Sequence, residues 1–332
     1  MSTASTSTAS SGTGTTAPVL AAQDVTVAFG FGARAHPVLH SVGVRLERGR
    51  TLGLVGESGS GKSTLARAMI GLIRPRSGRI LLDGEDVTAL RGRRLTGLRR
   101  RVQLIPQDPY GSLNPRMTVG DAIAEAIEPR RGGLRRHRAA VAGWLETVAL
   151  DGSAAERYPH EFSGGQRQRI AIARALAVEP EVIIADEVTS ALDCSVQAEV
   201  LNLLADLRAS LGLTMLFISH DLAVVRHVSD EVAVMYLGRI VEQSPRDELF
   251  DRPRHPYTRL LLDSVPDGVL QVPTVVGEPP DPSDPPPGCP FHTRCPSGPL
   301  ANPDRTRCAT ERPEPVNPDS RASCHYPLVP HS

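Results

Sequence analysis

A nine-residue glycine-rich stretch constrains the fold of this chain more than any other feature. It reads Gly56-Glu57-Ser58-Gly59-Ser60-Gly61-Lys62-Ser63-Thr64 and fits the pattern G-x-x-x-x-G-K-[ST]. In this pattern, glycine N–H groups surround phosphate oxygens, the lysine reaches the outer phosphates and the hydroxyl binds Mg²⁺. Residues 51–55 read as a buried strand, and residues 62–70 as a helix whose N-terminus faces the anion. The stretch therefore predicts a phosphate-binding site between a strand and a helix.

The lysine of this stretch is unusual for a second reason. Lys62 is the only lysine in a chain with 37 lysine and arginine residues, so every other cationic side chain is an arginine. A compact ammonium and a planar guanidinium are not interchangeable where a charge must fit a confined site. We infer that this position requires lysine for a chemical reason.

Length and charge limit the class of protein. A chain of 332 residues allows one large or two ordinary domains, and its net charge of +0 provides no global attraction to nucleic acid or anionic lipid. No apolar run approaches the roughly 18 residues of a membrane span. The first cation is Arg34, so we expect no secretory signal or transit peptide and a cytoplasmic location.

The amino-terminal part divides into a tail and a strand region. Residues 1 to about 17 are almost entirely Ser, Thr, Ala and Gly, a composition that predicts disorder. Alternating apolar residues from Val19 to Phe29, and again from 38 to 46, predict antiparallel strands. Phe29 is the best placed aromatic to stack on an adenine, with Phe31 as a rival; the alternative for Phe29 is a place in the core.

The next segments carry many arginines and one notable glutamine. The strand at 79–82 closes with the turn Asp83-Gly84. Residues 91–101 are rich in arginine without interleaved aromatics, which favours a solvated helix face over a nucleic-acid site. Gln107 follows the strand that begins near residue 101, and its side chain can reach a bound Mg²⁺ and its water.

Residues from about 116 to 180 are predicted to be helical, with helices at 119–127, 139–150 and 164–178. The sequence Ser163-Gly164-Gly165-Gln166 opens the last of them. Ser163 suits an N-cap, and two glycines leave bare N–H groups that can receive an anion. An ordinary helix cap is the alternative, but it does not explain a second anion site in one chain.

Acidic residues and a histidine follow two later strands. The buried strand at 182–186 ends in Asp186 and Glu187, at the edge where an α/β sheet binds ligands. Beside a phosphate loop, Asp186 can hold Mg²⁺ and Glu187 can polarise the attacking water. Asp193 precedes a helix at 195–209, and His220 ends a strand at 213–219. His220 can contact a γ-phosphate, although a lone histidine is more often structural.

Together these motifs resemble the nucleotide-binding subunit of an ATP-binding cassette (ABC) transporter. The resemblance covers about residues 19–265, and Ser163-Gly164-Gly165-Gln166 is its most specific element. It implies an α/β phosphate-loop cassette with a RecA-like core, an amino-terminal antiparallel β subdomain and a helical subdomain. Phe29 departs from the usual tyrosine, and Val188 stands where proline is usual.

The resemblance also implies a role for each motif. The stretch 56–64 is the Walker A loop, Gln107 the Q-loop glutamine, and 163–166 the signature sequence. The remaining roles fall on Asp186 of Walker B, the catalytic Glu187, Asp193 of the D-loop and the switch residue His220. Ser63, Gln107 and Asp186 would be the Mg²⁺ ligands, and ATP the substrate.

The mechanism that the family implies requires partners. Two such subunits, identical or paralogous, pack head to tail, so each ATP lies between the Walker A loop of one and the signature sequence of the other. Two transmembrane permeases dock near Gln107, and no nucleic acid is involved. The subunit would be peripheral on the cytoplasmic face of the membrane.

Three segments are similar to the oligopeptide/dipeptide importer branch: 107–119, Tyr158 to Ser163, and Arg254-His-Pro-Tyr-Thr258. This branch implies an extracytoplasmic peptide-binding protein as a further partner. Nickel-chelate and some sugar importers share much of it. A soluble ABC ATPase of DNA repair or translation, and a redox sensor, are the alternatives from other classes.

The carboxyl-terminal part, residues 266–332, holds 17 of the 29 prolines and is expected to be a loop-rich extension. It carries Cys289, Cys295, Cys308 and Cys324, spaced C-x5-C-x12-C-x15-C. Four thiolates suit a [4Fe–4S] cluster or Zn²⁺, and the family resemblance favours the cluster. His292 is a further possible ligand, and Cys194 is expected to be a small packed residue. The expected division is a disordered tail (1–18), a nucleotide-binding domain (19–265, helical at about 116–180) and the extension (266–332).

Overall fold

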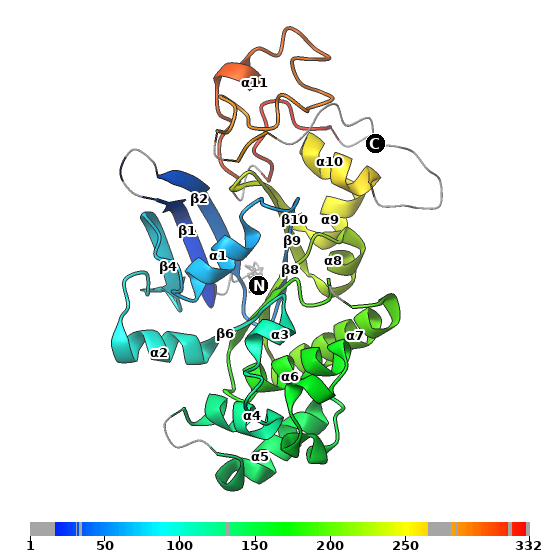
Figure 1. The fold of residues 1–332 in the computed structure, drawn as a ribbon. Helices are drawn as coiled ribbons and strands as arrows, with labels where there is room; N and C mark the ends of the chain where they lie inside the picture. Colours follow the sequence, from blue (N-terminus) through cyan, green and yellow to red (C-terminus); the bar gives the residue numbers. More distant parts are fainter. Residues whose placement is uncertain are drawn as a thin grey trace, which may run out of the picture.

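The computed structural model describes residues 17–30, 32, 35–129, 133–190, 192–264, 280–282, 284–317 and 321–329. Its centre is a six-stranded sheet (Figure 1). In spatial order the strands are β10 (Arg239–Pro245), β9 (Glu231–Tyr236), β3 (Thr51–Val55), β8 (Thr214–Ile218), β7 (Val182–Asp186) and β6 (Val102–Ile105). Only the β10–β9 pair is antiparallel among these strands. The parallel strands are apolar because both of their faces are covered.

A second, antiparallel sheet lies beside the first. Its order is β2 (His36–Leu46), β1 (Leu20–Phe29), β4 (Ser77–Leu82) and β5 (Glu85–Asp86). Its apolar residues share a hydrophobic core with α1 (Lys62–Met69), which follows the glycine loop. The prediction of antiparallel amino-terminal strands is confirmed.

Helices cover the sheet and form a lobe at one end of the molecule. Figure 1 shows α4 (Val119–Ile127), α5 (Leu134–Thr147) and α6 (Gly164–Leu176) together at the end opposite α11 (Arg307–Thr310). The predicted helix at 119–127 is confirmed residue for residue, and α5 begins five residues before its predicted start. The shorter elements of this region are α3 (Pro109–Ser112), η2 (Gly152–Glu156) and η3 (Pro159–Glu161).

The remaining helices are α2 (Gly92–Arg101), α7 (Cys194–Leu211), α8 (Leu222–Val228), α9 (Arg246–Asp251) and α10 (Pro256–Asp263). In α2 only Leu98 is buried, which confirms a solvated helix face for the arginine-rich segment. Among the described residues, no helix is long and apolar enough to cross a membrane.

The parallel strands bring the predicted motifs to one edge of the sheet. Ile218 pairs with Leu54 on one side and with Asp186 on the other. The loops that follow β3, β7 and β8 therefore begin side by side, as the carboxyl ends of parallel strands must. The phosphate loop, the acidic pair and His220 all follow from this register.

The extension runs along the free edge of β10. Gln243 N donates to Arg321 O over 2.9 Å, and Ser323 N donates to Val241 O over 2.8 Å. These bonds satisfy backbone groups that an edge strand otherwise leaves unpaired. The described part of the extension is mostly turns, as its prolines predict. The tail at 1–16 and Phe31 lie outside the described residues.

Candidate nucleotide site

The glycine loop has a backbone that side chains would not tolerate. Gly56 has φ 155° and Gly61 has φ 107°. A Cβ on Gly56 would lie 2.1 Å from Met235 O, and one on Gly61 would lie 2.8 Å from Leu39 Cδ2. The glycines are therefore required both for conformation and for the close approach of neighbouring chain.

Lys62 is held inside this loop. Its side chain is 4% exposed, and Nζ donates to Gly56 O over 2.8 Å and to Glu57 O over 3.0 Å. Burial lowers the pKa of Lys62, while the nearby carboxylates act in the opposite direction. The ammonium is therefore poorly hydrated, which strengthens its attraction to a phosphate.

Three features of the loop and its surroundings fit a Mg²⁺-bound phosphate chain. Ser63 Oγ donates to Asp186 Oδ1 over 3.0 Å, so a hydroxyl and a carboxylate of the kinds that Mg²⁺ prefers lie together. Burial raises the pKa of Asp186, an effect that a bound cation would oppose. Ser60 Oγ is buried and has no hydrogen-bond partner among the described residues.

Glu187 is the centre of the acidic end of the site. Gln107 Nε2 donates to Glu187 Oε2 over 2.9 Å, and His220 Nδ1 lies 3.7 Å from the same oxygen. Lys62 Nζ lies 3.9 Å from Glu187 Oε1. The backbone of Glu187 has φ 49°, which is uncommon outside glycine, and its N–H donates to Ile218 O over 3.0 Å. The first residue of α1 and residues from the loops that follow β6, β7 and β8 thus meet at one carboxylate.

Phe29 ends β1 and is 48% exposed, which excludes the alternative that it is a core residue. It pairs with His36 across the two strands. Its exposed ring is free to stack on a planar ligand. Ser58 and Gly59 are exposed at the tip of the loop, and Thr64 is half-buried on α1.

The predicted second anion site is a capped helix start. Ser163 Oγ accepts from Gln166 N over 3.3 Å, and Gln166 Oε1 accepts from Ser163 N over 3.0 Å. This capping box opens α6. Among the described residues, no hydrogen bond or ion pair connects the segment 163–166 to the glycine loop. The structure therefore does not bring these two motifs together within one chain.

Asp193 caps the helix that follows the acidic pair. Its Oδ1 accepts from Val196 N over 3.0 Å and from Ser195 Oγ over 2.6 Å, and these bonds lower its pKa. Cys194, the next residue, is exposed at the start of α7. The prediction that Cys194 is packed is wrong, because the helix cap places it on the surface.

Three residues of the site were not predicted from the motifs. Glu57 N donates to Tyr257 Oη over 3.0 Å, and the guanidinium of Arg294 binds the Glu57 carboxylate. Tyr236 completes the group through a contact of its hydroxyl with Arg294. Tyr257 belongs to the Arg254–Thr258 segment and Arg294 to the cysteine segment. Both segments resemble the family pattern, but the sequence did not predict that either residue contacts the glycine loop.

The four carboxyl-terminal cysteines do not form a metal centre in the structure. Among the described residues, no three His, Cys, Asp or Glu side chains are placed to hold a metal ion. The prediction of a [4Fe–4S] cluster at Cys289, Cys295, Cys308 and Cys324 is therefore not supported. Burial raises the pKa of Cys289 to about 12 and that of Cys324 to about 11, which favours neutral thiols. His292 Nδ1 lies 2.8 Å from Cys289 O, a packed position.

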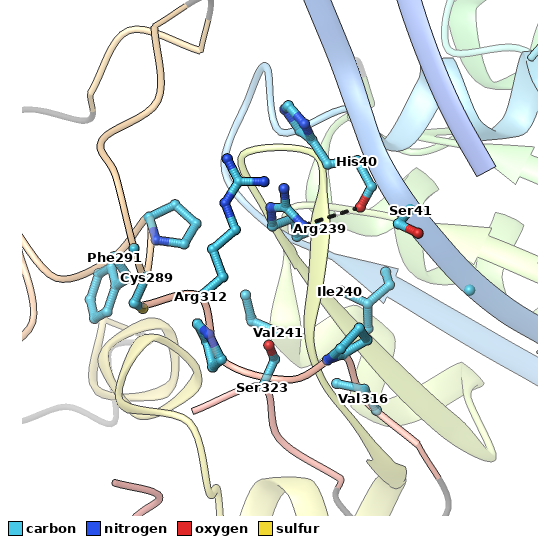
Figure 2. Close-up of a pocket in the computed structure, with 15 residues that line it drawn as sticks. His40, Ser41, Arg239, Ile240, Val241, Cys289, Phe291, Arg312, Val316 and Ser323 are labelled. Carbon is cyan, nitrogen blue, oxygen red and sulfur yellow. Dashed lines mark hydrogen bonds between the residues drawn. The ribbon is translucent and has the colours of Figure 1, made fainter. Parts of the chain in front are cut away.

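Two hollows border the extension. One, of about 510 Å³, lies over the glycine loop between Glu57 to Ser60, Tyr236 and residues 280–282. The other, of about 50 Å³, lies between the extension and strands β2 and β10 (Figure 2). Figure 2 shows Phe291 and Cys289 on one wall of it and His40 with Arg239 on the other. The extension therefore reaches both the sheet and the glycine loop.

The fold and the site define a phosphate-loop nucleoside triphosphatase. The family model described as "ABC transporter" matches residues 39–190, and "Oligopeptide/dipeptide transporter, C-terminal region" matches residues 241–298. A protein of Sinorhizobium fredii, "Probable peptide ABC transporter ATP-binding protein y4tS", is 53% identical over 86% of this chain and 82% of its own. The oligopeptide transport protein AppF of Bacillus subtilis is 52% identical over 77% of this chain and 80% of its own.

Solved structures agree with these matches. The cbiO1 protein of Clostridium perfringens, part of an ABC transporter complex, has a TM-score of 0.63 and 28% identity over 71% of this chain and 92% of its own. The cassette MJ0796, solved as a dimer with ADP and Pi, has a TM-score of 0.61 and 30% identity over 68% and 98%. The chain belongs to the ATP-binding subunits of ABC transporters, within the branch that carries the oligopeptide/dipeptide carboxyl-terminal region. It is accordingly an ATPase.

Proposed function

We propose that the chain is the ATP-hydrolysing subunit of an importer of oligopeptides or dipeptides. The observation that carries the enzymatic part is the meeting of Gln107, His220 and Lys62 at Glu187. The peptide substrate is supported by the carboxyl-terminal family match and by the names of the relatives. Those names favour peptides over nickel or another small solute.

Each residue has a step in the proposed mechanism. Lys62 and the N–H groups of 56–64 bind the β- and γ-phosphates, and Phe29 stacks on the adenine. Ser63, Asp186 and Gln107 would hold Mg²⁺, which neutralises the charge that develops on the transferred phosphate. Glu187 orients and polarises the attacking water, and His220 contacts the γ-phosphate.

We propose further that the site is completed by a second subunit. Ser163 and Gln166 cap the start of α6, and the N–H groups of Gly164 and Gly165 in its first turn have no partner within the helix. The dimeric state of the MJ0796 cassette supports a pair of subunits, which we propose to be arranged head to tail. Identical and paralogous partners both satisfy this arrangement.

We propose two permeases and an extracytoplasmic peptide-binding protein as further partners. The chain would lie on the cytoplasmic face of the membrane. The division into 1–18, 19–265 (helical at about 116–180) and 266–332 belongs to the proposal as well. The two family matches cover residues 39–190 and 241–298, so the first lies within the proposed nucleotide-binding domain and the second spans the proposed boundary at residue 265.

The cysteines form a finer part of the proposal. Cys289 N donates to Cys308 O over 2.8 Å, so the extension brings the backbone of two of the four cysteines together. We propose that the four cysteines bind metal, as a [4Fe–4S] cluster or as Zn²⁺. Purification without oxygen, followed by visible absorption and iron and zinc analysis, tests this; a colourless protein free of both metals would contradict it.

The decisive experiment is the Glu187→Gln variant in the assembled transporter. The variant keeps an acceptor for Gln107 but loses the carboxylate, so ATP should still bind while turnover falls by about 100-fold or more, or about 2.7 kcal/mol in the barrier. Turnover equal to that of the wild type would refute the assignment. Peptide uptake into vesicles with and without ATP tests the substrate.

A further inference from the structure

The cysteine-bearing segment of the extension makes a direct charged contact with the glycine loop. Arg294 Nη1 lies 3.1 and 3.2 Å from the two carboxylate oxygens of Glu57, and Nη2 lies 3.2 Å from one of them. The Arg294 side chain is only 6% exposed. A guanidinium that meets a carboxylate through both nitrogens fixes its orientation as well as its charge.

Glu57 is held at its backbone as well as at its side chain. Its N–H donates to Tyr257 Oη over 3.0 Å, and its carbonyl accepts from Lys62 Nζ over 3.0 Å. One residue of the loop thus contacts the extension, α10 and the phosphate-binding lysine. A shift of the Glu57 side chain would move the carbonyl that orients Lys62.

An aromatic cluster makes the contact rigid. The ring centroids of Tyr236 and Tyr257 lie 4.6 Å apart, and Phe291 lies 5.3 Å from each of them. All three side chains are at most 1% exposed. Phe291 belongs to the same short segment as Arg294, so the guanidinium cannot move far without breaking a packed core.

The electrostatic balance of the contact is favourable. Burial works against the charged form of Arg294, but the hydrogen bonds to Glu57 and Tyr236 outweigh it and raise the pKa of the guanidinium. Removal of one partner of such a pair leaves the other charge partly buried and uncompensated. The Glu57 carboxylate, whose side chain is 29% exposed, would then turn toward water and away from its present position.

We propose that Arg294 is a positioning residue of the ATP site, which holds the phosphate loop through Glu57 and couples ATP affinity to the packing of the segment 289–295. The proposal rests on the assignment of 56–64 as the phosphate loop. The extension would then contribute to nucleotide binding through Arg294, although it lies outside the predicted nucleotide-binding domain. Arg294 touches neither ATP nor water in this role and acts only through Glu57.

Two substitutions of Arg294 test the proposal in the full-length chain. Arg294→Met keeps the apolar stem without the charge, and Arg294→Lys keeps the charge without the fork. We expect the Kd of a fluorescent ATP analogue to rise about tenfold in Arg294→Met, equivalent to about 1.4 kcal/mol, and by less in Arg294→Lys. In the assembled transporter, KM for ATP should rise similarly while kcat stays within about twofold.

A matched control separates this effect from loosening of the extension. Arg305 lies in the same extension, where it donates to Ser297 O and stacks 4.6 Å from the Tyr326 ring. Arg305→Met should leave the Kd for ATP unchanged. An equal loss in both variants, or a wild-type Kd in Arg294→Met, would overturn the proposal.

The contact between Arg294 and Glu57 also predicts that substitutions of the two residues have non-additive effects on the Kd for ATP, and that ATP in turn affects the segment 289–295. In a Glu57→Gln background, Arg294→Met should change the Kd by less than about twofold, because the contact is already broken. ATP should slow amide hydrogen exchange of residues 289–295 in the wild type and not in Glu57→Gln, since coupling acts in both directions. Additive effects, or no protection by ATP, would refute the coupling. If the proposed function itself were wrong, the result would be a different one: Glu187→Gln would retain turnover.

Discussion

Lys62 Nζ and Glu187 Oε1 lie 3.9 Å apart, with side chains 4% and 15% exposed. The cation that we propose to bind phosphate thus faces the carboxylate that we propose to activate water, and both are shielded from solvent. In such surroundings their attraction is stronger than at a surface, so small changes in the position of either charge have large effects. The proposed phosphate site therefore depends on the length and shape of the Lys62 side chain.

Lys62→Arg should therefore strongly impair hydrolysis, although it retains the charge. The ammonium fits between Gly56 O and Glu57 O, whereas a guanidinium is longer and planar. We expect kcat of the assembled transporter to fall by about 100-fold or more. Arg93→Lys on the exposed face of α2 is the control and should leave kcat unchanged. Near wild-type turnover of Lys62→Arg would contradict our explanation of the single lysine.

Ser163→Ala should affect both stability and activity. Loss of this N-cap should lower the free energy of unfolding by about 1 kcal/mol. Thr118 caps α4 in the same way, so Thr118→Ala should cost a similar amount. Only Ser163→Ala should also reduce the ATPase rate, because its hydroxyl faces the proposed partner site. Urea unfolding and steady-state ATPase measurements on both variants check this, and equal ATPase rates would argue against the composite site.

The elements of the nucleotide site could be predicted because each is local. The strand at 51–55 that precedes the glycine loop is confirmed residue for residue, and so is the helix at 119–127 in the lobe, because apolar periodicity and caps determine both within a few residues. Gln107 and Glu187 meet because β6 and β7 are parallel neighbours and each residue follows the carboxyl end of its strand.

Contacts of the extension could not be predicted in this way. Arg294 and Glu57 are 237 residues apart, and no periodicity relates them. The spacing of the cysteines likewise indicates which thiols are available and not how closely a proline-rich loop brings them, and among the described residues they are not placed as a metal site. The position of Cys194 was wrong for a similar reason, since the cap at Asp193 decides which face it occupies.

The two glycines at the start of α6 should respond differently to alanine. A Cβ on Gly165 would lie 2.3 Å from Val196 Cγ1, whereas one on Gly164 meets only Leu192 Cδ2, at 3.8 Å. Gly165→Ala should therefore lower the free energy of unfolding by about 1–3 kcal/mol. Gly164→Ala should leave it unchanged or slightly higher, yet lower the ATPase rate. The opposite order of stabilities in urea would contradict this packing.

Stability should also depend on pH through His255. This residue is 1% exposed, its Nδ1 accepts from Tyr257 N over 3.0 Å, and burial lowers its pKa to about 3. The unfolded chain binds a proton at His255 below the ordinary pKa of 6.5, while the folded chain does not until about pH 3. Stability from this group is therefore full above pH 6.5 and decreases as the pH falls toward 3, by at most about 1.4 kcal/mol per pH unit.

His255→Asn isolates this contribution. Asparagine keeps an acceptor for Tyr257 N and does not titrate, so the variant should lose stability less steeply than the wild type between pH 6.5 and pH 4.5. The comparison is needed because burial raises the pKa of neighbouring Glu242, which gives a slope of the opposite sign. Glu242 is present in both proteins, so its slope cancels in the difference. Urea unfolding at half-unit pH steps measures that difference, and parallel curves would show that His255 is protonated in the folded chain at these pH values.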